Sequence, residues 1–151
     1  MLQDILIQLY EGDLGKLRDE LELYADDAGL WTTVGGITNS GGNLALHLVG
    51  NLEHFIGGVL GGSGYVRDRD AEFSEKAIPR QEMLDSIDRM KPILLETIKN
   101  LTDEKLAALY PLEVFGHPMT SECFLVHLST HLNYHLGQIN YHRRSLAAPG
   151  T

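Results

Sequence analysis

One segment of this chain indicates its architecture most directly: HLSTHLNYHLGQ, residues 127–138. Its histidines, His127, His131 and His135, follow one another at steps of four residues. Four residues advance an α-helix by about 400°, so each step returns to nearly the same side about 6 Å further along. The pattern therefore predicts a helix over residues 120–146 that carries three imidazoles in one row.

Working outward, the same helical periodicity recurs through the rest of the chain. Apolar residues at steps of three and four predict helices over residues 2–27, 41–60, 80–100 and 120–146. Gly12 and Gly15 allow a break in the first helix, and Pro92 should kink or split the third. Pro149-Gly150 should stop the last helix. The fold class is therefore all-α, in a single domain over residues 1–151.

The connections are of unequal length. Residues 32–42 are rich in turn residues, and Ser40 is a suitable N-cap for the second helix. Residues 61–79 form a long connection between the second and third helices and contain RDRDAEF. A loop of this length is usually functional or needed to cross the domain. We expect a short helical turn at Thr102 and irregular structure, with room for a small extended pair, from Tyr110 to Pro118.

Composition excludes some classes of partner. Twelve basic and twenty-one acidic residues give a net charge of −9, which repels phosphate backbones and anionic lipid. We therefore expect no nucleic-acid or membrane partner. Residues 1–13 are amphipathic and acidic, without the basic start and apolar stretch of a secretory signal, which favours a cytoplasmic location. The single cysteine, Cys123, has no partner for an internal disulfide.

The histidine row suggests a metal site. Two imidazoles one turn apart can bind one ion at about 2.0–2.1 Å, whereas the outer pair of the row lies about 12 Å apart. A metal would thus use two adjacent histidines and a ligand from another helix, for which His47 in the apolar stretch LALHLVGNLEHF is the strongest candidate. The alternative is that these histidines are hydrogen-bonded core residues. The HExxH motif and the paired Glu-x-x-His motifs of di-iron bundles are absent.

At these motifs the chain resembles the DinB/YfiT-like family. The resemblance rests on LALHLVGN (residues 44–51), RDRDAEF (67–73) and HLNYHLGQI (131–139), and it covers nearly the whole chain. It implies a four-helix bundle, often a homodimer, with a long connection between helices two and three. It further implies one divalent metal ion, nickel or zinc, on His47, His131 and His135.

Four other residues are candidates for groups around the metal, and each has a structural alternative. Asn51 would orient a ligand or water, or form a helix–helix hydrogen bond. His54 and His127 would carry protons, or pack in the core or at its rim. Gln138 would bind a ligand, or close the bundle.

The remaining polar residues carry weaker expectations. His117 and His142 are expected at the surface, and Cys123, Tyr134 and Tyr141 as packing or interface residues. Arg67 and Arg69 are expected to pair with the acidic residues interleaved with them. No Asp or Glu is evident beside the triad, and Asp13 and Glu53 cannot be placed from sequence.

An ion on three protein nitrogens keeps an open coordination position, which favours catalysis over a structural role. Such an ion lowers the pKa of a bound water or binds a thiol as its thiolate. The resembled family includes transferases and isomerases that use low-molecular-weight thiols. The first hypothesis is a metal-dependent enzyme that acts on a small molecule such as a thiol, with its catalytic residues unknown. The alternatives are a non-catalytic metal- or ligand-binding bundle and a metal-free helical interaction protein.

Overall fold

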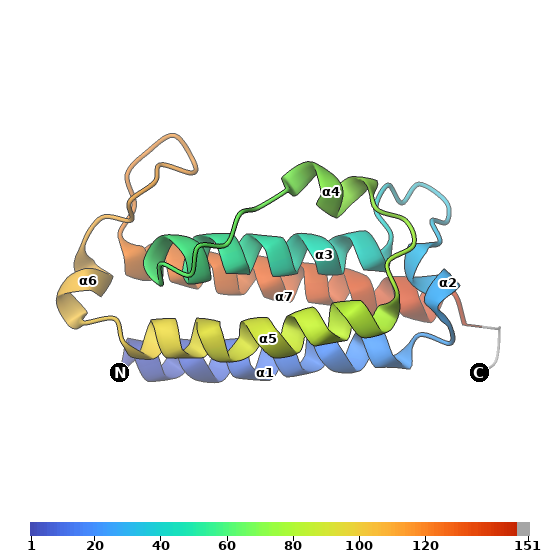
Figure 1. The fold of residues 1–151 in the computed structure, drawn as a ribbon, viewed down its shortest axis with the longest axis horizontal. Helices are drawn as coiled ribbons and strands as arrows, with labels where there is room; N and C mark the ends of the chain where they lie inside the picture. The colour runs from blue at the N-terminus through green and yellow to red at the C-terminus, as the bar shows by residue number, and fades with distance from the viewer. Residues whose placement is uncertain (148–151) are drawn as a thin grey trace.

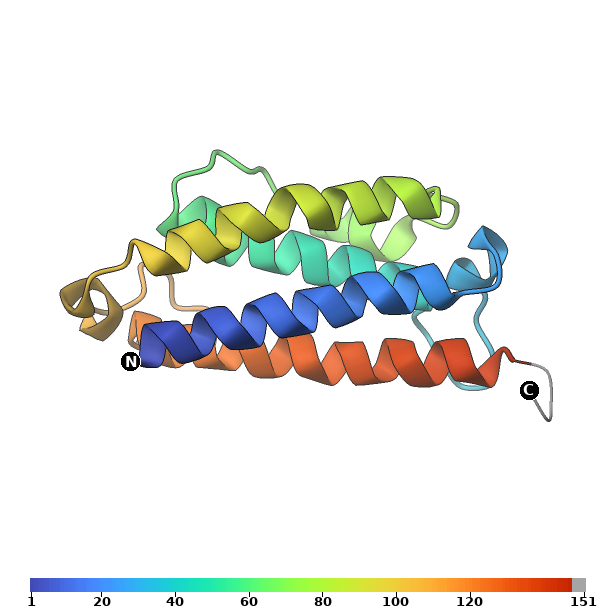
Figure 2. The ribbon, with the colours of Figure 1, turned by 90° about the horizontal axis from the view of Figure 1, so that it is seen from below.

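The computed structural model describes residues 1–147, and its four long helices form a bundle (Figures 1 and 2). These helices are α1 (Leu2–Leu23), α3 (Gly41–Leu52), α5 (Arg80–Lys99) and α7 (Ser121–Ser145). Helix α1 packs against α5 and α7, and α3 packs against the same two helices. The arrangement confirms the all-α four-helix bundle expected from the sequence.

The first helix is shorter than predicted. Helix α1 ends at Leu23, because the backbone of Tyr24 is extended, and a separate short helix α2 (Asp27–Trp31) follows. The carboxylate of Asp26 caps α2 by accepting from the backbone N–H of Gly29 at 2.8 Å. The prediction of a single helix over residues 2–27 was therefore wrong at its C-terminal end. The chain remains helical through Gly12 and Gly15.

The second predicted helix contains two kinds of helical turn. Ser40 caps α3 by accepting from the backbone N–H of Asn43. After Leu52 the chain continues as a π-helix, η1 (Glu53–Leu60). Short π-helical segments occur frequently at functional sites. A π-helix has more residues per turn than an α-helix, so the side chains of His54 and Phe55 point in other directions than they would in a continued α-helix.

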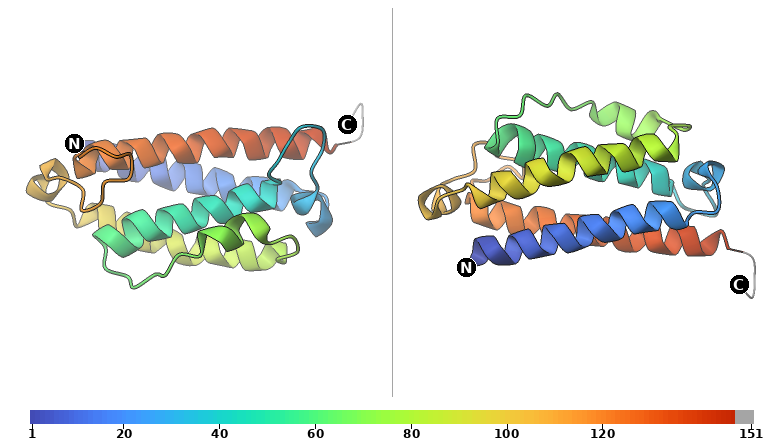
Figure 3. Two further views of the ribbon diagram at one scale, coloured as in Figure 1. Left: turned by 90° about the horizontal axis from the view of Figure 1, so that it is seen from above. Right: turned by 60° about the horizontal axis from the view of Figure 1, so that its bottom comes forward.

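The long connection contains a helix that the periodicity did not reveal. Within it, α4 (Arg69–Ser74) begins after Asp68, whose side chain accepts from the backbone N–H of Ala71 at 3.0 Å. Helix α4 packs on α3, and Figure 3 shows it lying along that helix on the outside of the bundle. RDRDAEF therefore provides an N-cap and a docked helix.

The second half of the chain follows the predicted order. Helix α5 runs through Pro92 without a break, so the predicted split is absent. Helix α6 (Asp103–Ala107) follows, and an irregular loop is closed by an antiparallel bridge between Leu109 and Thr120. The predicted stop at Pro149-Gly150 lies outside the described residues. Within residues 1–147, no helix combines the length and apolar character needed to span a bilayer.

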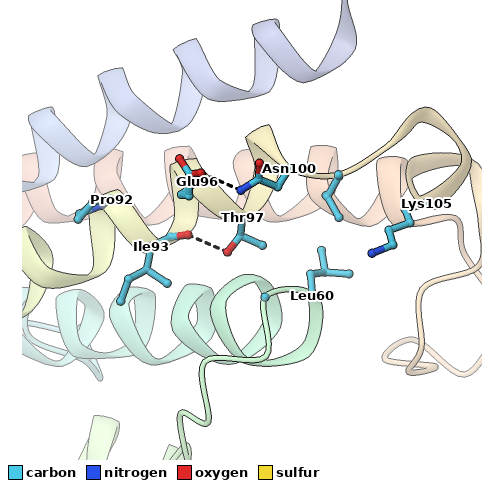
Figure 4. A pocket seen from close by; sticks show the side chains of 9 residues that line it. Leu60, Pro92, Ile93, Glu96, Thr97, Asn100 and Lys105 are labelled. Atoms are coloured by element: carbon cyan, nitrogen blue, oxygen red, sulfur yellow. Dashed lines mark hydrogen bonds between the residues drawn. The ribbon is translucent and has the colours of Figure 1, made fainter.

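The core is formed by apolar stripes from all four long helices. In α1, Leu6, Leu17 and Leu21 are buried, but Leu9 is 47% exposed. A groove of about 660 Å³ lies between the end of η1 and the second half of α5 (Figure 4). Thr97 in its wall donates to the carbonyl of Ile93, and Asn100 donates to Glu96, so these groups bond within α5. The triad histidines do not line this groove, which is therefore no candidate metal centre.

Candidate metal centre

Three histidines from α3 and α7 converge at the middle of the bundle. Nε2 of His47 lies 3.3 Å from Nε2 of His131, which in turn lies 3.1 Å from Nε2 of His135. One ligand atom from each lies within 4.8 Å of the other two. His47 is buried, and the two α7 histidines are partly buried. His131 and His135, the second and third histidines of the row, thus lie close to His47, and both contacts are made between Nε2 atoms.

The surroundings keep the two α7 imidazoles neutral. Burial, together with neighbouring imidazoles and Arg67, lowers the pKa of His131 to about 4. Burial also lowers the pKa of His135, although Gln138 opposes this shift. A neutral imidazole has a lone pair on one ring nitrogen, and that nitrogen is the one that binds metal ions. At pH 7 both residues are therefore in the ligand form.

Glu72 on α4 contacts the outer nitrogen of His47. Its Oε1 lies 3.0 Å from His47 Nδ1, and the side chain is 6% exposed. An acidic residue that was not evident from the sequence therefore lies beside the triad. Burial tends to raise the pKa of Glu72, but hydrogen bonds from His47 and Arg67 outweigh it and hold this pKa below its usual value.

Arg67 completes this arrangement. Its Nε donates to Glu72 Oε2 at 2.8 Å and its Nη2 donates to Oε1 at 2.9 Å. The expected local pairing of Arg67 is therefore confirmed. Arg69 instead places its guanidinium over the ring of Phe73, 5.2 Å from the ring centroid. A two-bond fork of this kind compensates much of the cost of burying a carboxylate.

The other two histidines have different outer contacts. His135 Nδ1 lies 2.6 Å from Gln138 Oε1, so this amide oxygen orients the ring. The amide nitrogen of Gln138 donates to the hydroxyl of Tyr134 at 3.3 Å. Nδ1 of His131 is buried without a hydrogen-bond partner. Of the four residues proposed around the triad, Gln138 is the one that contacts a triad imidazole by hydrogen bonding.

Asn51, His54 and His127 lie near the centre with less defined roles. Asn51 is buried, and its Oδ1 has no hydrogen-bond partner. The ring of His127 stacks at 6.4 Å from that of His131 and contacts Phe115 edge-on at 4.6 Å. His54 packs against Phe55 on η1. Aromatic contacts therefore hold both histidines at the rim.

His142 is not a surface residue. It is 4% exposed, with Nδ1 2.7 Å from the hydroxyl of Tyr24 and Nε2 2.7 Å from the carbonyl of Thr32. It therefore ties the end of α7 to the chain around α2, away from the triad contacts. His117 is exposed, as expected.

The two acidic residues that the sequence could not place belong to other contacts. Asp13 is buried, accepting from Asn133 at 3.1 Å between α1 and α7. Glu53 opens η1 and has a pKa raised by burial. Tyr134 and Tyr141 are 64% and 73% exposed, so neither packs in the core of this chain. Cys123 is exposed as well.

A cavity of about 630 Å³ has His135 in its wall. The segment Gly36–Asn39 covers one side, and α7 forms the other. Within residues 1–147, no Lys, Arg, Asp or Glu lines it. Its lining residues are Gly36, Ile37, Thr38, Asn39, Leu44, Tyr134, His135, Gln138, Tyr141, His142 and Ser145. The volume lies within the range of small-molecule pockets.

The triad fits a divalent ion better than it fits a metal-free core. A neutral imidazole has one proton, so a single N–H at His131 Nε2 would have to serve both short Nε2 contacts unless a cation lies among the three nitrogens. Imidazole nitrogens suit zinc, nickel and similar ions. The set His47, His131 and His135 is therefore one that could hold a metal ion.

Comparison with known proteins identifies the family of the chain. A family described as "Protein of unknown function (DUF1572)" matches residues 16–149. The chain belongs to this family. No curated protein matches the chain.

Two solved structures share the fold of this family member. A DinB-like protein from Bacillus cereus ATCC 10987 is 21% identical, with a TM-score of 0.75 over 100% of this chain and 99% of that one. A conserved protein from Enterococcus faecalis is 15% identical, with a TM-score of 0.76 over 93% and 94% of the two chains. The fold is thus that of DinB-like proteins.

Proposed function

We propose that this protein binds one divalent metal ion, zinc or nickel, through Nε2 of His47, His131 and His135, and is an enzyme that transfers a low-molecular-weight thiol to a small electrophile. The observation that carries the proposal is the convergence of three imidazole nitrogens, two of them from partly exposed residues, beside a cavity that His135 lines.

The surroundings of the triad favour a thiol over a water as the group that is activated. Hydrolysis at zinc commonly uses a carboxylate as general base, as in the HExxH metalloproteases. Here the carboxylate that contacts the triad, Glu72, is buried and held by two hydrogen bonds from Arg67. A thiol needs less help, because its pKa is already about 8.5 and falls further on coordination.

The chemistry is a substitution in which the charges balance. When bound, the ion would offer an open position at which the thiol loses its proton to solvent and binds as its thiolate. The sulfur lone pair would form a bond to an electrophilic carbon, while the leaving group would depart with the electron pair of its own bond. The uncharged wall of the cavity near Tyr134 and Ile37 suits an uncharged electrophile.

The test is a thiol titration of cobalt-substituted protein. Each of several small thiols is added while the absorption band of thiolate bonded to cobalt is followed. We expect the band to appear with an affinity that rises with pH until the free thiol ionises, because binding releases a proton. A spectrum that no thiol changes would refute the thiol-transfer proposal.

Turnover is then measured with uncharged alkyl electrophiles and should be lost together with the metal. The matched control is His117→Ala, since His117 is exposed and is not part of the triad. It should keep both the band and turnover. A protein that gives the thiolate band but no turnover with any electrophile would be a binder and not an enzyme.

A further inference from the structure

We propose that Glu72 is a positioning residue: it fixes the proton of His47 on Nδ1 and so leaves the Nε2 lone pair free for a metal ion. The inference rests on the proposed function, since it concerns the same triad. It assigns a role to the RDRDAEF segment, which the sequence left unexplained.

The position of the proton follows from the partners of the two ring nitrogens. An ionised carboxylate only accepts hydrogen bonds, so the 3.0 Å contact between Glu72 Oε1 and His47 Nδ1 requires the proton on Nδ1. A neutral imidazole then has its lone pair on Nε2. That nitrogen points to Nε2 of His131 at 3.3 Å. The carboxylate therefore selects the tautomer that the triad needs.

Arg67 keeps the carboxylate both charged and fixed. Glu72 Oε1 accepts from His47 Nδ1 and also from Arg67 Nη2, so these two nitrogens lie 3.4 Å apart around one oxygen. Oε2 accepts from Arg67 Nε at 2.8 Å. Both oxygens are thus engaged by donors, and the side chain has no freedom to turn away from His47.

Gly50 makes room for this contact. A Cβ atom at this position of α3 would lie 2.0 Å from Glu72 Oε2 and 2.7 Å from its Cδ. Any larger residue would push the carboxylate off the helix, because a real Cβ never approaches so closely. The absence of a side chain at Gly50 and the placement of α4 are therefore parts of one arrangement.

The three triad histidines differ in what orients them. His47 has a charged partner in Glu72, His135 has the neutral amide oxygen of Gln138, and Nδ1 of His131 has none. A carboxylate partner fixes the ring and makes it a more basic ligand than a neutral partner does. His47 is therefore the ligand whose orientation depends most on a single neighbouring side chain.

The experiment compares Glu72→Gln with wild type and with Glu75→Gln, an exposed position on the same connection. A glutamine has one acceptor oxygen, which cannot serve both His47 and Arg67 as the carboxylate does. The first readout is the ¹⁵N NMR spectrum of metal-free protein, which reports the tautomer of His47. The second is zinc affinity, measured by competition with a chromophoric chelator.

We expect His47 to be protonated on Nδ1 in wild type and Glu75→Gln, and to become a mixture of tautomers in Glu72→Gln. Zinc affinity of Glu72→Gln should fall by about 10–100-fold, the usual effect of losing such a partner. Gly50→Ala gives an independent route, because its methyl group displaces the carboxylate while Glu72 and Arg67 remain. Gly50→Ala should also give a mixture of His47 tautomers and a lower zinc affinity. It therefore tests the proposal even if Glu72→Gln fails to fold.

The outcomes separate the two proposals. If the wild-type protein binds no zinc, the metal site is refuted. If Glu72→Gln nevertheless changes the tautomer of His47, the positioning role of Glu72 is retained. An unchanged tautomer together with zinc affinity within twofold of wild type, in a folded Glu72→Gln or Gly50→Ala variant, would overturn the positioning role. A purely structural role predicts lower thermal stability with both readouts unchanged, and would overturn it equally.

Discussion

Nε2 of His47 and Nε2 of His131 lie 3.3 Å apart, although 84 residues separate the two histidines in the chain. Helices α3 and α7 pack directly against each other, and each presents a histidine at the contact. Two such nitrogens meet at this distance when both point to one shared cation or when one donates a proton to the other. The third nitrogen, from His135, makes the shared cation the better explanation, because one N–H on His131 Nε2 would have to serve both His47 and His135.

Metal content is the most direct check. Protein purified without chelator or affinity tag should contain close to one divalent ion per chain, and His47→Ala combined with His135→Ala should abolish binding. Removing a ligand should weaken binding by more than the roughly 10–100-fold typical of an outer partner. Elemental analysis gives the stoichiometry, and His117→Ala is the control. Full metal content in the double variant would refute the site.

The choice of His131 and His135, rather than His127 and His131, as the α7 ligands has its own test. His127→Ala should keep the metal, because its ring stacks beside His131 at 6.4 Å and its nitrogens do not join the triad. His131→Ala should lose it. Parallel chelator-competition measurements on the two variants decide the point. Equal losses would mean that the ion lies one helical turn nearer the start of α7.

The two α7 histidines of the triad were predictable because their spacing depends on one local rule. A step of four residues places His131 and His135 on one face of a helix, whatever surrounds them. The choice of His47 as third ligand came from its apolar context and from the family resemblance. The bundle itself followed from the same periodicity, repeated in four segments.

Glu72 was missed because its contact depends on tertiary structure. Glu72 lies 25 residues from His47, and nothing in RDRDAEF indicates which helix of the bundle that segment packs against. One signal was present, since Asp68 is a good N-cap and indicates a helix start inside the connection. Gly50 was a second signal, because a glycine inside an apolar helix often marks a close approach of another group.

The prediction of a surface position for His142 was wrong, although the helical periodicity indicated a buried one. Seven residues after His135 amount to about 700°, which returns nearly to the same face of the helix. The basic residues that follow, Arg143 and Arg144, are typical of a solvated helix end. The end of α1 at Leu23 was similarly indicated by the capping residue Asp26, whereas the π-helical turn of η1 has no comparable local signal.

The buried contact of His142 should contribute to stability and leave metal binding unchanged. Tyr24→Phe removes the hydroxyl that lies 2.7 Å from His142 Nδ1, so a buried nitrogen is left without its partner. Such a loss costs about 1–3 kcal/mol. Urea unfolding of metal-free protein measures it, with the exposed Tyr141→Phe as control. Reduced zinc affinity in folded Tyr24→Phe would contradict a purely structural role.

The shifted pKa of His131 predicts how stability depends on pH in the metal-free protein. In the folded state this pKa is about 4, whereas an unfolded histidine titrates near about 6.5. Between these values the unfolded chain binds a proton that the folded chain excludes, so the free energy of unfolding falls as the pH decreases. Above about pH 6.5 and below about pH 4 this group should contribute no slope.

Carboxylates also titrate in part of this window, so the prediction concerns a difference between variants. His131→Gln removes the titrating group, and its loss of stability between pH 6.5 and pH 4.5 should be smaller than that of wild type. Urea midpoints at four pH values give both curves, and the exposed His117→Gln should follow wild type. Parallel curves for wild type and His131→Gln would show that His131 is not held neutral by its surroundings. That result would also remove the argument that the triad is ready to bind a metal ion at neutral pH.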